Sequence, residues 1–209
     1  METKFTEQQS LALISEMITQ ARNNFQKHSG TSMIFNGCMV AFTALLNVAL
    51  VFILTNPTQS FWIWFLMIPA WFIDKIIARK VDRETLVKTH IDKVISAAWR
   101  GFGIATILFI GIIFGYGYSM QNSKIFILIT PIIMLMAGTA EFVTAKACRF
   151  KPFLYGAYVM WGGTVCCLAN YIFMHNWAGI SHFFVLAICM ILGFVIPGYK
   201  LNKLAEKHV

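Results

Sequence analysis

Hydrophobic residues along this chain come in long unbroken runs rather than in the alternating pattern of a strand. A helix needs about 20 mostly apolar residues to cross the roughly 30 Å of a bilayer's hydrocarbon core. Six runs approach or exceed that length, at residues 33–54, 61–77, 101–118, 125–147, 154–174 and 180–199. The pattern therefore predicts an all-α fold, a polytopic membrane helix bundle with six transmembrane helices.

Short polar segments separate these runs in pairs. Residues 55–60 include Asn56-Pro57, which stops a helix, and residues 119–124 and 175–179 are equally short. Short turns force the helices that they join to be antiparallel. We therefore expect three hairpins, formed by the first and second, third and fourth, and fifth and sixth spans.

Composition strengthens this prediction. Hydrophobic residues make up 58% of the 209 residues and charged residues only 12%, and the mean hydropathy is +0.67. Soluble domains carry about 25% charged residues. A disordered chain is thereby excluded, and a soluble domain is disfavoured. Five cysteines are too few, and odd in number, for a disulfide scaffold.

The basic residues predict an orientation. With both termini on one side, that side holds every lysine and arginine except Lys124. Such a bias marks the cytoplasmic side, so both termini are expected in the cytoplasm. Residues 1–30 have no apolar core of a secretory signal. Topology accounts for the net charge of +8, and we expect the lipid bilayer, not a nucleic acid, as the partner of this surface.

Two segments outside the runs have amphipathic patterns. Residues 1–30 predict a cytoplasmic amphipathic helix, separate from a six-span membrane domain at 31–209. Its apolar stripe consists of Leu11, Ile14, Met17, Ile18, Ala21 and Phe25. This stripe fits the inner leaflet or the bundle, or it docks a cytosolic protein or a second copy. Residues 78–100 predict a second cytoplasmic helix that runs into the third span.

Acidic residues within a span are costly, which makes Asp74 and Glu141 the candidate ionisable site. Both are expected in the inner third of the membrane. Asp74 also fits an interfacial position beside Lys75. Glu141 also fits a structural ion pair, for example with Lys75, or a buried hydrogen bond. Pro69 and Pro131 are expected to kink the second and fourth spans, and Pro197-Gly198 to end the sixth.

The chain lacks a constellation for catalysis, so the sequence predicts no enzyme. It contains no GxSxG, GxxxxGK[ST] or CxxC motif. His175 and His182 stand seven residues apart across a turn, but two ligands without a nearby acid or thiol make a poor metal site. We therefore predict no metal and no cofactor. Gly111 and Gly115 form a GxxxG motif that fits helix packing or a homo-oligomer.

Two short motifs carry a resemblance that covers nearly the whole chain. They are RFKPFLYG at 149–156 and VIPGYKL at 195–201. With the six spans and the N-terminal helix, the chain resembles a family of small bacterial inner-membrane proteins with no assigned activity. The resemblance implies a bacterial inner-membrane location and no catalytic residue.

Two function classes fit these features. The first is a non-catalytic regulatory or sensory membrane subunit that acts through its cytoplasmic amphipathic helices. The second is a small proton- or cation-coupled transporter that uses Glu141 and Asp74.

Overall fold

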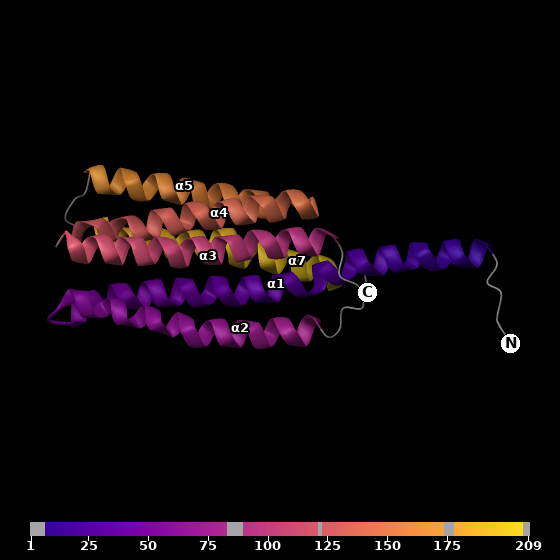
Figure 1. Ribbon diagram of the computed structural model, residues 1–209, viewed down its shortest axis with the longest axis horizontal. Coiled ribbons are helices and arrows are strands. Elements are labelled where there is room, and N and C mark those ends of the chain that lie inside the picture. Colours follow the sequence, from indigo (N-terminus) through magenta and orange to yellow (C-terminus); the bar gives the residue numbers. More distant parts are fainter. Residues whose placement is uncertain (1–6, 83–89, 121–122, 174–177, 207–209) are drawn as a thin grey trace.

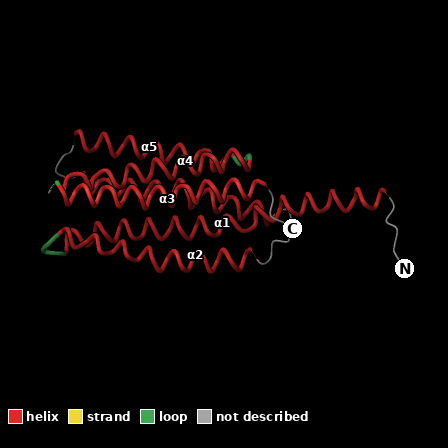
Figure 2. Tube along the Cα trace, viewed as in Figure 1, coloured by secondary structure: helices red, strands yellow, loops and turns green. Residues whose placement is uncertain are grey.

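In a computed structural model the protein is helical over nearly all of the residues that the structure describes, which are 7–82, 90–120, 123–173 and 178–206. No strand occurs among them (Figure 2). The elements in chain order are α1 (Glu7–Ile53), the 3₁₀ helix η1 (Pro57–Leu66), α2 (Met67–Asp82), α3 (His90–Ser119), the 3₁₀ helix η2 (Ser123–Leu128), α4 (Ile129–Cys148), α5 (Lys151–Phe173), α6 (Ala178–Met190), the π-helical turn η3 (Ile191–Val195) and α7 (Ile196–Glu206).

Six helical stretches are long and apolar enough to cross a membrane, as the sequence predicted. They span Gly30–Ile53, Gln59–Arg79, His90–Ser119, Lys124–Cys148, Lys151–Phe173 and Gly179–Leu204. The largest change in bounds is in the third stretch, which begins at His90, eleven residues before the predicted start at Gly101.

These helices run side by side along the long axis of the molecule (Figure 1). α1 packs against α2, α6 and α7, whereas α4 packs most extensively against α5. Arg149 ends α4 in the left-handed region, with φ of 53°, and α5 begins only two residues later. This abrupt turn explains the close pairing of α4 with α5.

The main core lies between α1, α4, α5 and α6. Its fully or almost fully buried members include Ala44, Met134, Met160 and Cys167. Large apolar side chains cover the outside instead, and Ile107 and Phe173 are 73% and 84% exposed. A soluble monomer rarely exposes contiguous apolar surface of this extent, so the surface suits a lipid environment.

The N-terminal segment and the first span form one continuous helix, α1, with no break near residue 30. Its first part projects beyond the other helices, at the end of the molecule where α7 also ends (Figure 1). Side chains of the apolar stripe from Leu11 to Phe25 lie outside the described residues. Whether the stripe is amphipathic in space therefore stays a prediction.

The expected second cytoplasmic helix is divided between two elements. Residues 78–82 continue α2, and residues 90–100 begin α3. Residues 83–89 lie outside the described part of the chain. Ile91 and Val94, two apolar residues of this segment, are exposed.

The prolines differ from expectation in position and effect. Pro69 and Pro131 are each the third residue of an α-helix that follows a 3₁₀ segment, so each lies in a first turn and not at a mid-helix kink. Pro197 was expected to end the sixth span, but α7 continues to Glu206. The helix accommodates Pro197 because the π turn η3 directly precedes it.

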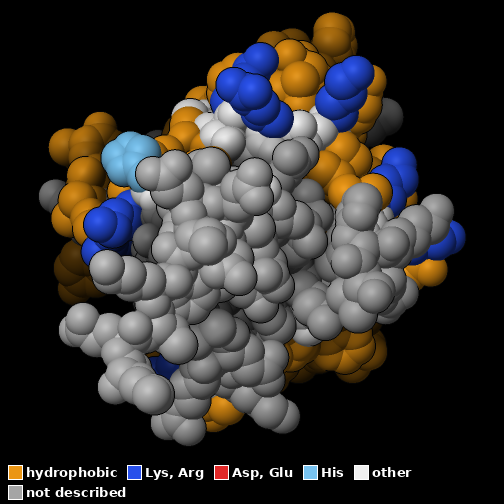
Figure 3. Space-filling view, turned by 90° about the vertical axis from the view of Figure 1, so that its right-hand side faces the viewer, with side chains coloured by type: hydrophobic (Ala, Val, Ile, Leu, Met, Phe, Trp, Pro, Cys, Tyr) orange, Lys and Arg blue, Asp and Glu red, His pale blue; other side chains and the backbone are white. Residues whose placement is uncertain are grey.

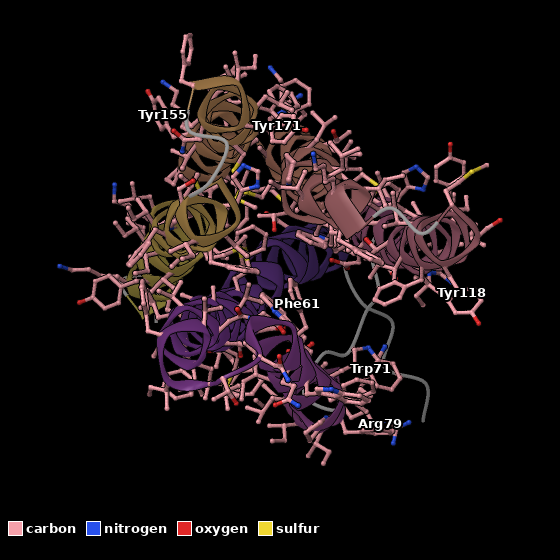
Figure 4. The ribbon with its side chains drawn as sticks, turned by 90° about the vertical axis from the view of Figure 1, so that its left-hand side faces the viewer. Phe61, Trp71, Arg79, Tyr118, Tyr155 and Tyr171 are labelled. Carbon is pink, nitrogen blue, oxygen red and sulfur yellow. The ribbon has the colours of Figure 1, made fainter. Side chains whose placement is uncertain are left out.

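The two ends of the molecule differ in their side chains. Lys and Arg side chains surround the end from which α1 projects (Figure 3). Figure 4 views the opposite end, where Phe61 and Tyr118 lie close to the turns. At that end Asn47 of α1 and Ser60 of η1, both fully buried, form two hydrogen bonds of 3.3 Å.

Candidate functional site

Glu141 is the most unusual polar residue in the described structure. It lies in the C-terminal half of α4, and its side chain is 0% exposed. Neither carboxylate oxygen has a hydrogen-bond partner among the described residues. The alternative of an ion pair or hydrogen bond at Glu141 is therefore wrong for this part of the chain. Lys75, the partner considered for it, places its ammonium 5.4 Å from the ring centroid of Trp71.

The Glu141 carboxylate lies beside Gly156 and near the backbone carbonyl of Gly193. A Cβ atom on Gly156 of α5 would overlap both Glu141 Oε1 and the carbonyl oxygen of Gly193 in η3. The carboxylate of α4 and the carbonyl of η3 therefore face one small space beside Gly156. Only a residue without a side chain at position 156 allows the three elements to meet there.

The π turn at Gly193 has a cause in the sequence. The amide of Ile196 donates to the carbonyl of Ile191, five residues earlier, which is the π pattern. Pro197 has no amide hydrogen and cannot donate to the residue four positions earlier, which is Gly193. The chain thus denies the Gly193 carbonyl its usual α-helical donor beside a buried carboxylate.

Thr144 and Trp99 close the site toward the C-terminal end of α4. Thr144 lies three residues after Glu141 and donates to the Ala140 carbonyl at 2.9 Å. Its hydroxyl oxygen accepts from the indole N–H of Trp99 in α3 at 3.1 Å. The Trp99 ring also meets Phe194 of η3 edge-on, with centroids 5.7 Å apart. One tryptophan therefore joins α3, α4 and the π turn.

Asp74 lies in a different environment. It is half-buried in α2 and accepts a hydrogen bond from the hydroxyl of Ser32 in α1. Asn36 donates to the Ser32 carbonyl at 3.0 Å, which adds a second polar contact to the cluster. Trp71 and Arg79 lie on the outside of the same helix (Figure 4). The structure does not unite Asp74 and Glu141 in one site, since each has its own neighbours.

Other candidate groups have structural partners. His182 is 2% exposed, and its Nε2 lies 2.8 Å from the Cys167 carbonyl. His175 lies outside the described residues. No group of three or more His, Cys, Asp or Glu residues that could hold a metal occurs in the described ranges. Gly111 and Gly115 have open space where a Cβ would stand, so no described residue packs against them there.

Sequence reasoning selected Glu141 but missed what surrounds it. Gly156 and Gly193 carried no individual signal, and Trp99 was not among the predicted site residues. The one available signal was the spacing of Gly193 and Pro197, which identifies a carbonyl without its i+4 amide donor.

Comparison with family models, with curated proteins and with solved structures found no match to this chain.

Proposed function

We propose that the protein is a small multi-pass membrane transporter coupled to protons or another cation, with Glu141 as the group that binds the coupling ion. One observation carries the proposal: a wholly buried carboxylate that has no hydrogen-bond partner among the described residues. An ionised carboxylate in such a place is strongly unfavourable unless a cation compensates it. Because the described residues provide no such cation, solution must supply one.

The proposed arrangement has six helices crossing a bacterial inner membrane as three antiparallel hairpins, with both termini in the cytoplasm. The bias of Lys and Arg toward one side supports the orientation. The exposed apolar side chains support insertion. The resemblance carried by residues 149–156 and 195–201 supports the inner membrane. Glu141 then lies in the cytoplasmic half of the bilayer.

The test is ion flux into liposomes that contain the purified protein and a trapped pH-sensitive dye, driven by a potassium diffusion potential. We expect proton entry with the wild-type protein and a loss of at least about a hundredfold with Glu141→Gln. Asp74→Asn is the matched control, and it should retain the wild-type rate because Asp74 is not part of the Glu141 site. Unaltered flux in a folded Glu141→Gln protein, or no proton or sodium flux in the wild type, would overturn the proposal.

A regulatory or sensory subunit is the second candidate, and one observation favours it. α1 extends beyond the other helices as a single continuous helix (Figure 1), and its projecting part is suited to docking a cytosolic protein. Crosslinking in native membranes followed by mass spectrometry tests it. A deletion of residues 1–29 should remove the crosslinked partner, and an unchanged set of bound proteins would count against this function.

A further inference from the structure

We infer that the ligand of the Glu141 site is a proton and that the carbonyl oxygen of Gly193 is its second binding partner. In this arrangement the carboxylate takes one proton from solution and becomes the neutral acid, whose O–H donates to the Gly193 carbonyl. No other bond changes. The inference deepens the proposed function and rests on it for the use of the site, although the binding itself is measured separately.

Placement of the two oxygens supports the pairing. A single methyl-sized point next to Gly156 touches both Glu141 Oε1 and the Gly193 carbonyl oxygen. Two acceptor oxygens that face one space repel each other unless something positive lies between them. A proton on the carboxyl group turns that repulsion into a hydrogen bond.

The π turn makes the Gly193 carbonyl suitable for this role. An α-helical carbonyl normally receives an amide hydrogen from four residues later, and here that residue is Pro197. The i→i+5 bond from Ile196 to Ile191 shifts the register just before it. Single π turns inside α-helices occur frequently at functional sites. The buried acid provides the donor that the helix lacks.

The composition of the site favours a proton over a metal cation. Mg²⁺ needs six oxygen ligands and Ca²⁺ six to eight. The nearest atoms to a Cβ on Gly156 are those of the Glu141 carboxylate and the Gly193 carbonyl oxygen. The nearest atoms to a Cβ on Gly193 are the Gly156 carbonyl oxygen at 3.3 Å and the side chain of Met160, whose sulfur lies at 3.5 Å. The Thr144 hydroxyl already donates to Ala140 and accepts from Trp99, which leaves it only one lone pair.

The elements around Glu141 carry several other charged or titratable groups. On α4 itself, the Lys146 ammonium lies over the Phe142 ring at 5.4 Å. On α3, Arg100 donates to the Ser96 carbonyl. On α6, the Cys189 thiol points to the Val159 carbonyl. On α5 the Cys167 side chain is buried and Tyr171 is half-buried. The other such groups on α5 and α7 whose side chains the structure describes are exposed: Lys151, Tyr155, Tyr158, Cys166, Tyr199, Lys200 and Lys203. None of these groups forms a hydrogen bond with Glu141.

Infrared spectroscopy of the purified protein in lipid tests the inference directly. A protonated carboxyl group has a C=O stretching band that shifts to higher wavenumber when its hydrogen bond weakens. We expect one such band at neutral pH that disappears in Glu141→Gln. Pro197→Ala restores an amide that competes for the Gly193 carbonyl, so it should shift the band upward. Pro69→Ala is the control, because it alters a proline remote from Glu141, and it should leave the band unchanged.

Glu141→Asp provides a second variant if Pro197→Ala does not fold. It keeps the acid but withdraws it by one methylene, which should also raise the band. A band at the same position in the wild type and in these variants would exclude Gly193 as the partner. A band that NaCl or KCl removes at constant pH would show a metal cation in place of the proton. The absence of any band lost in Glu141→Gln would overturn proton binding.

Flux and spectroscopy separate the two proposals. A Glu141 band that responds to Pro197→Ala in a protein that carries no proton would keep this inference and refute transport. Proton flux that requires Glu141, together with a band insensitive to Pro197→Ala, would keep transport and refute the role of Gly193.

Discussion

Asp74 and Glu141 look alike in the sequence and lie in contrasting surroundings in the structure. Asp74 is half-buried and receives a hydrogen bond from Ser32 of the neighbouring helix. Glu141 is wholly buried and receives none from any described residue. Both are carboxylates in apolar helices, so residue type and hydropathy do not separate them.

The facing residue separates them. The helix opposite Asp74 presents a serine hydroxyl, which donates to the carboxylate and lowers the free energy of burying it. The elements opposite Glu141 present Gly156 and Gly193, which have no side chain to donate. An acidic residue that faces glycines receives no side-chain donor from them, and under the proposed function its compensating charge comes from solution.

The largest expected contrast is in chemical labelling. An apolar carbodiimide reacts with protonated carboxyl groups and reaches them from the lipid phase. We expect it to modify Glu141 in membranes and to leave Asp74 largely unmodified, because only Glu141 has no donor among the described residues. Mass spectrometry of the digested protein measures both sites at once. Labelling of Glu141 should fall as the pH rises, since the reagent needs the protonated acid.

Glu141→Gln is the control for this labelling, since it removes the reactive group. Equal modification of Asp74 and Glu141 would show that their surroundings do not differ in reactivity. The contrast between the two residues would then be broken.

A pair of glycines in α5 tests the packing beside Glu141. Gly156→Ala places a methyl group against the carboxylate and the Gly193 carbonyl, and overpacking of this kind costs about 1–3 kcal/mol of unfolding free energy. Gly162→Ala is the matched control in the same helix, since no atom lies within 4 Å of its Cβ position. It should be neutral or stabilise by up to about 1 kcal/mol. Thermal unfolding in detergent measures both, and equal effects would contradict the close approach at Gly156.

The six apolar helices were predictable because length and hydropathy alone decide them. Their bounds moved where neighbouring polar residues continue a helix, as at His90. The prediction that Pro197 ends the sixth span was wrong, because the proline was interpreted as a helix terminator. In the structure a π turn before Pro197 accommodates the missing hydrogen bond, so the helix continues past the proline.

Glu141 is the one residue of the candidate site that could be predicted from the sequence. Glu141 is identified by charge within an apolar run, which is a local property. The lack of a hydrogen-bond partner for Glu141 among the described residues is a tertiary property, because it depends on which residues of α5 and η3 face α4. The same reasoning explains Asp74, where the donor Ser32 lies 42 residues earlier in the chain. Helix rotation decides both cases, and periodicity in nearly uniform apolar runs does not fix it.

Removing the Ser32 hydroxyl should make Asp74 resemble Glu141, which has no hydrogen-bond donor among the described residues. Ser32→Ala eliminates the hydroxyl that donates to the carboxylate, and we expect a loss of about 1 kcal/mol, because Asp74 is only half-buried and water replaces part of the bond. Carbodiimide labelling of Asp74 should rise in this variant. Thr139→Ala is the control, since its exposed hydroxyl bonds only to its own helix at Leu135. No change in either stability or labelling would show that Ser32 does not protect Asp74.

The smallest expected effect concerns Trp99, which donates to Thr144 three residues after Glu141 in α4. Trp99→Phe keeps a ring against Phe194 but loses the N–H that donates to Thr144, so stability should fall by about 0.5–1.5 kcal/mol. Trp62→Phe is the control, because Trp62 is 70% exposed and should tolerate the change. If the Trp99 side chain limits access to Glu141, carbodiimide labelling of Glu141 should accelerate in Trp99→Phe and not in Trp62→Phe. Equal labelling rates would restrict Trp99 to a packing role and leave burial between α4, α5 and η3 as the source of the difference between Glu141 and Asp74.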